Sequence, residues 1–100
     1  MSKLTKVFDL QDRFAPGADV VAREVGGETI LLDLGTGTYF GLNEVGGKLW
    51  QSLEAGQRSI SELCDTVEQT FDAKRDIIER DVVALVQDLA NRNLIILEST

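Results

Sequence analysis

A chain of 100 residues, 43% of them hydrophobic, has the size and composition of one globular domain with one modest core. It holds no histidine and a single cysteine, Cys64, which excludes an internal disulfide and a metal site built from histidine and cysteine ligands. The formal net charge of -7 disfavours nucleic-acid binding unless basic residues gather on one face. No apolar run is long enough for a membrane, and the first ten residues lack the apolar core of a secretory signal, so we expect a cytoplasmic protein.

The first segment, residues 1–18, shows no hydrophobic period and ends at the turn-forming sequence PGAD. We therefore expect a flexible N-terminal lead-in there, followed by one domain over residues 19–97.

Three strands are predicted next. The runs VVAREV (residues 20–25) and ETILLDL (residues 28–34) are rich in β-branched and aliphatic residues and are joined by Gly26 and Gly27, which favour a tight hairpin. A short link then leads to TYFGL (residues 38–42), so the three strands form an antiparallel sheet. If Phe40 faces the core, its neighbour Tyr39 faces outward.

Two helices follow with clear start signals. Asn43 is a good N-cap for a helix over residues 44–55, which Gly56 is expected to end in a left-handed conformation. Ser59 and Glu62 have the spacing of a capping box at the start of a second helix, over residues 60–71.

A third helix is predicted over residues 75–91, with Asn93 as its left-handed C-terminal residue and a short extended segment after it. Its apolar arc is wider than contact with one layer requires. The order of elements predicts an α+β fold, in which a three-stranded antiparallel sheet is followed by a three-helix bundle of the winged helix-turn-helix kind.

The glycine-rich stretches do not predict a nucleotide site. The first, around Gly35, precedes a strand rather than a helix, and Leu49 stands where a phosphate loop needs Ser or Thr. For Gly46 and Gly47, inside the first helix, we favour close packing on the hairpin over a gap left for another backbone. Cys64 lies on an apolar helical stripe and predicts a buried structural thiol. We expect no cofactor, no metal and no enzymatic activity.

DNA binding is an alternative, because three helices beside a small sheet are typical of winged-helix regulators. The second helix carries Glu62, Asp65 and Glu68 with no Lys or Arg, and the third mixes both signs. Neither helix offers a basic stripe, which disfavours this alternative and a nucleic-acid partner.

Peptide recognition is the preferred hypothesis. The third strand is expected to be a sheet edge with open backbone groups, and it lies beside a helix with surplus apolar surface. An extended peptide can add to such an edge as a new strand. The candidate peptide-binding residues are Thr38, Tyr39, Phe40, Gly41, Leu42, Lys74, Ile77, Ile78, Asp81, Val82 and Leu85.

A family resemblance agrees with this hypothesis. The stretch LLDLGTGTYFGLNEVGGKLWQSLEAG (residues 31–56), then SISEL and DVVALVQDLANRNLI, resembles the PqqD-like family over roughly residues 19–96. The matching landmarks are Asp33, Tyr39, Leu42, Asn43, Gly46 or Gly47, Trp50, Leu53, Gly56, Leu63, Asp81, Leu85 and Leu89.

The resemblance implies three strands, three helices and a recognition element for ribosomally made, post-translationally modified peptides. Such domains bind the leader segment of a precursor peptide as a fourth strand and present it to a modifying enzyme, such as a radical SAM protein, a cyclase or a leader peptidase. On this sequence, the binding elements are residues 38–42 and 77–85.

One departure concerns the pathway. The quinone-pathway members carry Pro-Glu after the second strand and Cys-Asp-Gly near the end of the first helix, where this chain has Leu34-Gly35 and Glu54-Ala55-Gly56. The sequence is therefore more similar to stand-alone recognition proteins, including those of lasso peptide clusters. A dimerisation module, with weak homodimers formed through the same strand edge, is a further alternative.

Overall fold

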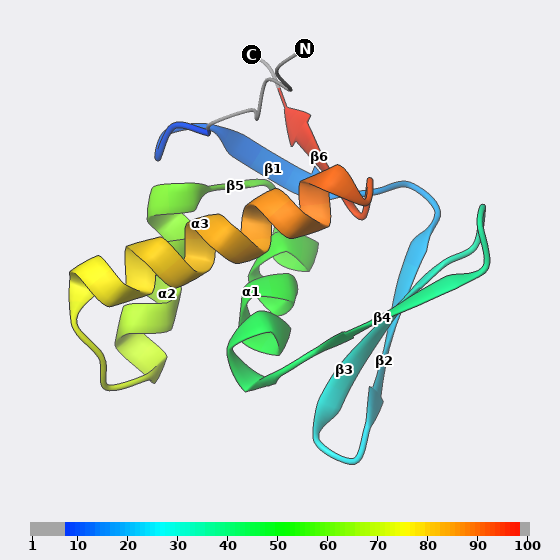
Figure 1. The fold of residues 1–100 in the computed structure, drawn as a ribbon, viewed down its shortest axis with the longest axis horizontal. Helices are drawn as coiled ribbons and strands as arrows, with labels where there is room; N and C mark the ends of the chain where they lie inside the picture. The colour runs from blue at the N-terminus through cyan, green and yellow to red at the C-terminus, as the bar shows by residue number, and fades with distance from the viewer. Residues whose placement is uncertain (1–7, 99–100) are drawn as a thin grey trace, which may run out of the picture.

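The computed structural model describes residues 8–98. The part of the lead-in prediction that concerns residues 1–7 lies outside them. In chain order, the described elements are β1 (Arg13–Pro16), β2 (Val20–Val25), β3 (Glu28–Asp33), β4 (Thr38–Leu42), α1 (Glu44–Ala55), β5 (Arg58–Ser59), α2 (Ile60–Thr70), α3 (Arg75–Asn91) and β6 (Ile95–Glu98). The three helices gather on one side of the molecule, and the long twisted hairpins of β2 to β4 project from the other side (Figure 1).

The sheet of β2, β3 and β4 is the predicted antiparallel meander. Gly26 and Gly27 form its first turn with φ of 60° and 87°, a conformation that costs glycine little and other residues much more. On the inner face, Leu31 and Leu42 are buried against the helices. The α+β class and the three-stranded sheet followed by three helices are confirmed.

Helix α1 has the predicted bounds and the predicted cap. The side chain of Asn43 accepts a hydrogen bond from the Gly46 backbone N–H at 2.9 Å. The prediction for the other end was wrong in its geometry: Gly56 ends the helix with φ of 158° and ψ of 163°, which is close to fully extended rather than left-handed.

Close packing explains the two glycines near the start of α1. A Cβ added at Gly46 would lie 3.0 Å from Leu42 Cδ2, and one added at Gly47 would lie 2.8 Å from Thr29 Oγ1. A side chain at either position would push the helix away from β3 and β4. The expectation that this helix packs closely on the hairpin is confirmed.

Helices α2 and α3 also follow the sequence signals. In the capping box of α2, Ser59 Oγ accepts from the Glu62 N–H at 3.1 Å, and Glu62 Oε1 accepts from the Ser59 N–H at 2.9 Å. Helix α2 ends one residue before the predicted Phe71, which has an extended backbone. Asn93, just past α3, has φ of 61° as predicted.

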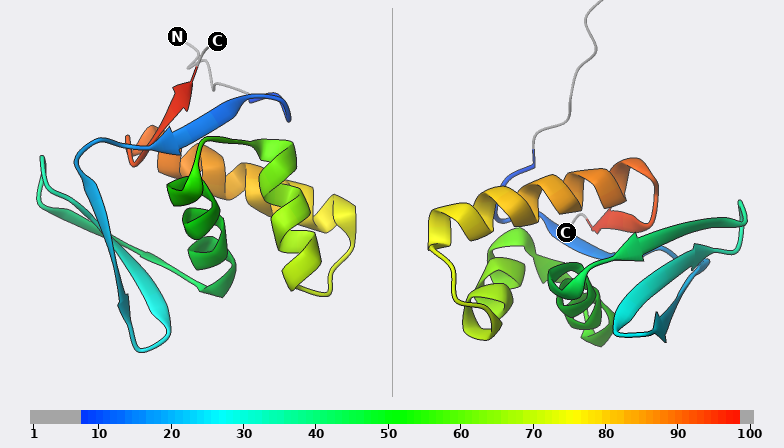
Figure 2. Two further views of the ribbon diagram at one scale, coloured as in Figure 1. Left: turned by 180° about the vertical axis from the view of Figure 1, so that it is seen from behind. Right: turned by 60° about the horizontal axis from the view of Figure 1, so that its bottom comes forward.

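A second sheet, in the order β5-β1-β6, was not predicted from the sequence. Strand β1 lies within the expected lead-in, yet it pairs with β6 from the other end of the described chain, and Phe14 is fully buried. Figure 2 shows this small sheet beside the helices. Residues 13–16 are therefore part of the fold. No helix within residues 8–98 combines the length and the apolar character that a membrane span requires.

Candidate functional site

Strand β4 has one free edge. It pairs with β3 on one side, and within residues 8–98 no strand pairs with its other side. The two-residue turn of the first hairpin closes on a hydrogen-bonded pair, Val25 and Glu28, and such pairs alternate along antiparallel ladders. The bonds from β4 to β3 therefore fall on Thr38, Phe40 and Leu42. By the same alternation, Tyr39 and Gly41 direct their N–H and C=O groups to the open edge.

Helix α3 runs beside this edge and leaves two hollows. The first, of about 340 Å³, lies at the C-terminal end of β4 and is lined by Phe40, Gly41, Leu42, Asn43, Val45, Asp81, Ala84 and Leu85. The second, of about 210 Å³, lies at the other end of the strand and is lined by Asp33, Thr36, Thr38, Tyr39, Phe40, Arg92 and Leu94. Because Phe40 lines both hollows, they lie next to each other along β4, and we treat them together as one candidate groove. We call it the β4–α3 groove.

Several of the predicted residues meet in this groove. Phe40, Gly41 and Leu42 face Asp81 and Leu85 across the first hollow. Thr38 and Tyr39 line the second hollow, and Tyr39 is 69% exposed on the outer side of the sheet, as expected from strand alternation. The strand and the middle of α3 thus bring together seven of the eleven predicted positions.

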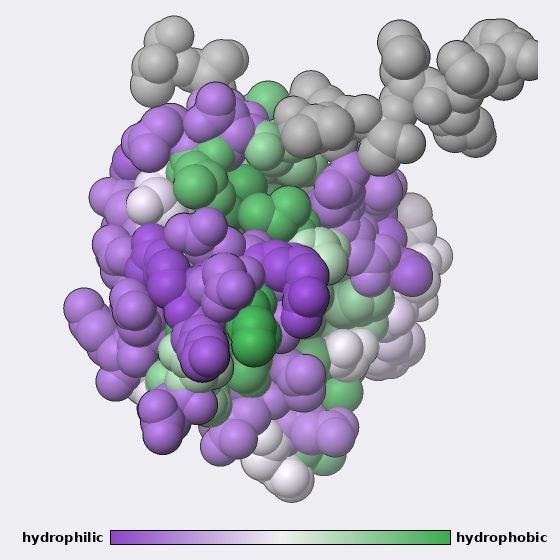
Figure 3. All heavy atoms as spheres, turned by 60° about the vertical axis from the view of Figure 1, so that its left-hand side comes forward, coloured by the Kyte–Doolittle hydropathy of each residue, from purple (hydrophilic) through white to green (hydrophobic). Residues whose placement is uncertain are grey.

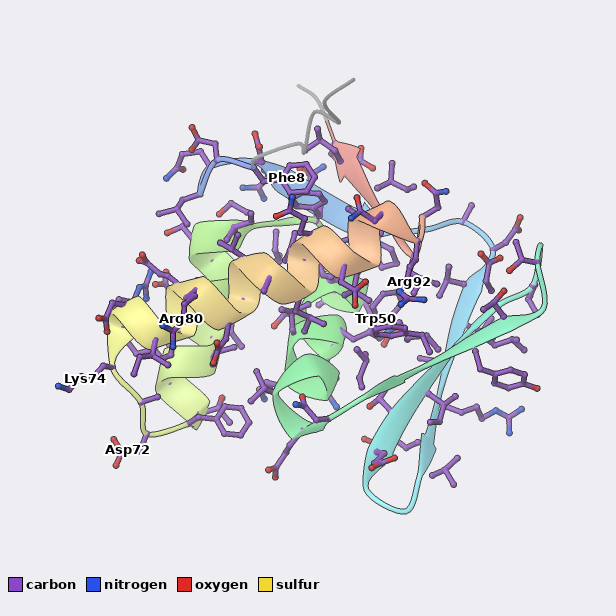
Figure 4. The ribbon with its side chains drawn as sticks, viewed as in Figure 1. Phe8, Trp50, Asp72, Lys74, Arg80 and Arg92 are labelled. Atoms are coloured by element: carbon purple, nitrogen blue, oxygen red, sulfur yellow. The ribbon has the colours of Figure 1, made fainter. Side chains whose placement is uncertain are left out.

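The other four positions lie elsewhere. Ile78 and Val82 are 3% and 1% exposed and line neither hollow, because they face the core. Ile77 is 40% exposed but lines neither hollow. Lys74 precedes α3 and extends into solvent at the end of the helix that lies farther from β4 (Figure 4). The predicted apolar arc of α3 is wide, and tertiary packing divides its residues between the core and the groove.

Sequence reasoning missed Arg92, which approaches the sheet from the C-terminal end of α3 (Figure 4). Its guanidinium carbon lies 4.8 Å from the centroid of the Phe40 ring, and its Nε donates to Asp88 Oδ1 at 3.0 Å. A signal was present: Asp81, Leu85 and Arg92 recur at the spacing of one helix face, so a groove residue early in α3 indicates which later residues share that face.

A different cation on α3, Arg75, is neutralised by acidic neighbours. It bonds to Asp65 and Glu68 of α2 at 2.8 Å each and to Glu79 at 3.0 Å. The hydrogen bonds to Asp65 and Glu79 raise its pKa above the ordinary value of arginine. From the α2–α3 side, apolar patches lie between hydrophilic ones (Figure 3). This arrangement does not favour a DNA-binding face on α2 or α3.

Cys64 is buried in the core, as predicted, and burial raises the pKa of its thiol. A raised pKa keeps the thiol protonated and disfavours a role as nucleophile. Among residues 8–98, no group of three or more Asp, Glu, Cys or His side chains is arranged to hold a metal ion.

An open strand edge beside an apolar groove defines a class of small α+β domains that can take up an extended peptide as an added strand. The chain belongs to the PqqD family, described as coenzyme PQQ synthesis protein D, and its match to this family covers residues 28–95. The resemblance noted from the sequence is thereby confirmed.

Solved structures with similar folds include TbiB1 in complex with the TbiA(beta) leader peptide. It is 37% identical, has a TM-score of 0.74, and the match covers 86% of this chain and 96% of that chain. A lasso peptide synthetase B1 complexed with the leader peptide is 24% identical, with a TM-score of 0.72 and coverage of 83% and 96%.

The third structure is the PqqD truncation of Methylobacterium extorquens PqqCD, described as a functional, stand-alone recognition element for ribosomally synthesised and post-translationally modified peptides. It is 22% identical, with a TM-score of 0.74 and coverage of 89% and 94%. At their lower identities, this structure and the lasso peptide synthetase support the shared fold alone. No curated protein matches the chain.

Proposed function

We propose that this protein binds the leader segment of a ribosomally synthesised precursor peptide by strand addition in the β4–α3 groove. The observation that carries the proposal is the open β4 edge beside an apolar hollow of about 340 Å³. The 37% identity to TbiB1, which was solved with a leader peptide, supports the choice of ligand.

Backbone hydrogen bonds and side-chain burial both contribute to the proposed binding. Tyr39 and Gly41 each offer one N–H and one C=O to the added strand, and such hydrogen bonds contribute about 0.5–1.5 kcal/mol each. Every second side chain of the peptide points into the groove. One apolar side chain buried beside Leu85 adds about 1.5–3 kcal/mol, which offsets part of the entropy lost when the peptide becomes ordered.

The protein itself is proposed to be non-catalytic. Its role is to hold the precursor while a separate modifying enzyme acts on the segment beyond the leader. A radical SAM protein, a cyclase and a leader peptidase are the enzyme classes that the family resemblance implies. The departures from the quinone-pathway pattern, at Leu34-Gly35 and Glu54-Ala55-Gly56, favour the enzymes of a lasso peptide pathway.

A titration tests the proposal. Leader segments from short open reading frames encoded beside this gene, and the TbiA(beta) leader as a second probe, are added to labelled protein while backbone amide NMR signals are followed. We expect saturable shifts at residues 38–42 and along the groove face of α3 from Asp81 to Leu85. Shifts confined to other surfaces, or none with any of these peptides, would refute it.

Self-association is the competing use of the same edge, because an unpaired strand can also pair with its own copy. Sedimentation measurements without peptide distinguish self-association from leader binding. A mass that rises with protein concentration, together with no peptide binding, would favour the dimerisation module.

A further inference from the structure

One face of α3 lines the whole β4–α3 groove, and its two ends carry opposite charges. Asp81 and Leu85 line the first hollow, beside Leu42, and Arg92 lines the second, beside Thr38. Helix and strand therefore run in opposite directions along the groove. A peptide in it meets Asp81 and apolar surface at one end, and Arg92 together with Asp33 at the other.

Contacts fix the position of Arg92 without using all of its donors. The guanidinium stacks on Phe40 at 4.8 Å, and Nε donates to Asp88 at 3.0 Å. Neither contact uses the terminal nitrogens Nη1 and Nη2. A held guanidinium with free donors matches the geometry of a carboxylate and loses little side-chain entropy on binding it.

One carboxylate, that of Asp88, already forms an ion pair with Arg92, but through Nε, and it leaves the pair Nη1 and Nη2 for a second carboxylate. Asp33 lines the same hollow, but its Oδ1 accepts from the N–H groups of Gly35 at 2.9 Å and Thr36 at 3.4 Å. The Arg92 side chain is 51% exposed. Of the described residues that line either hollow, Arg92 alone is basic.

We propose that Arg92 selects leader peptides with an acidic residue at one defined position. The inference rests on the proposed function and adds a sequence requirement to it. In an added strand, the residues opposite Leu42 and Thr38 both point into the groove, because they share the face of those side chains. These positions are four residues, or about 13 Å, apart.

Antiparallel addition, the more stable arrangement, fixes the order. The apolar residue that fills the first hollow comes first in the peptide, and Asp or Glu follows four residues later, beside Arg92. The chemical class of ligand is therefore an extended peptide with an apolar side chain and a carboxylate at this spacing.

Selection from a displayed library of random peptides tests this requirement. The wild-type protein, Arg92→Gln and Arg80→Gln are used in parallel. Arg80 is a matched control, because its side chain is 76% exposed on α3 and lines neither hollow. We expect wild type and Arg80→Gln to enrich Asp or Glu at the fourth position after an apolar residue. Arg92→Gln should keep the apolar preference and lose the acidic one.

A double-mutant cycle measures how strongly Arg92 and the peptide carboxylate interact. In a peptide selected by wild type, Glu→Gln or Asp→Asn at this position should weaken binding about fivefold, as expected for a partly exposed ion pair. The same peptide change should have less than about a twofold effect on Arg92→Gln, and Arg92→Lys should lie between, since lysine lacks the planar fork.

The outcomes separate this inference from the proposed function. An acidic preference that persists in Arg92→Gln, or no acidic preference in wild type, would overturn the role of Arg92 and leave leader binding intact. Selected peptides that bind outside the groove, or no selected binders at all, would overturn the proposed function together with it.

Discussion

Strands β2 and β4 are the two outer strands of one sheet, and both lack a second strand partner within residues 8–98. Their side chains differ. Strand β2 carries Arg23 and Glu24 in its second half, whereas β4 has no charged residue. The two hollows that β2 residues line include charged side chains of α1, Glu44 and Lys48 in one and Glu54 in the other, whereas the first hollow beside β4 includes Leu85 of α3. If β4 is the leader-binding edge, as proposed, an open backbone edge alone does not make a peptide site: charged side chains protect the edge of β2, and apolar surface beside β4 favours an added strand.

The largest expected effect comes from blocking the β4 edge itself. In Gly41→Pro, one edge N–H is lost and the proline ring obstructs the incoming strand, so leader affinity should fall roughly 100-fold. Calorimetric titration with the leader that shifts the NMR signals measures it. Ala22→Pro is the matched control, since its N–H points to the open edge of β2 by the same alternation. An equal loss of leader affinity in both variants would contradict the proposal that the leader binds at the edge of β4 and not at that of β2.

The next prediction concerns Leu85 of α3, which lines the first hollow beside β4. Leu85→Asp places a charge in the first hollow, and we expect at least a tenfold loss of leader affinity, about 1.4 kcal/mol. Ile77→Asp, on the same helix but outside both hollows, should change affinity by less than about twofold. Fluorescence anisotropy with a labelled leader compares them. If Ile77→Asp is as damaging as Leu85→Asp, the binding surface extends past the groove, as the sequence predicted.

A smaller effect is expected when β4 is made to resemble β2. Tyr39→Asp adds a charge at the exposed side of the edge and removes an aromatic contact for the added strand, so affinity should fall about fivefold. Val25→Asp, an exposed position on β2, is the control. Free energies of unfolding from urea titrations should stay within about 0.5 kcal/mol of wild type for both. Unchanged affinity in Tyr39→Asp would show that the edge tolerates charge.

The smallest effect is expected when β2 is made to resemble β4. Replacing Arg23 and Glu24 by Thr removes the charges that protect β2, and we expect self-association to increase about threefold. Sedimentation velocity over a concentration series measures it. The same exchange in a Gly41→Pro background should associate equally, because the new contact uses β2. Self-association that disappears in the Gly41→Pro background would instead show that the contact uses β4.

The parts of the fold that depend on local signals were predictable from the sequence. Asn43 and Ser59 satisfy free N–H groups of the helix that each begins, so their positions mark the helix starts. The pair Gly26 and Gly27 sets a turn that other residues adopt at a cost. Strand β1 was missed because its partner, β6, lies at the opposite end of the described chain, and no local pattern reveals such a pairing.

The site was only half predictable for a related reason. Hydrophobic periodicity and strand propensity predict that β4 is an edge strand and that the apolar arc of α3 is wider than packing on one layer requires. They do not show which apolar residues of α3 the other helices cover. Val82 turns to the core while Leu85 lines the groove, although both belong to one apolar arc. Arg92 depends on a contact with Phe40 that exists only after folding.

The pairing of β1 with β6 has a practical consequence for joining this domain to other proteins. Arg13 lies opposite Glu98, so β1 begins beside the point where β6 ends. The domain could therefore be circularly permuted: a linker would join the two ends, and new ends could open at the exposed Gly26–Gly27 turn. A modifying enzyme could then be tethered at either of two positions while β4, the strand proposed to bind the leader, stays covalently intact.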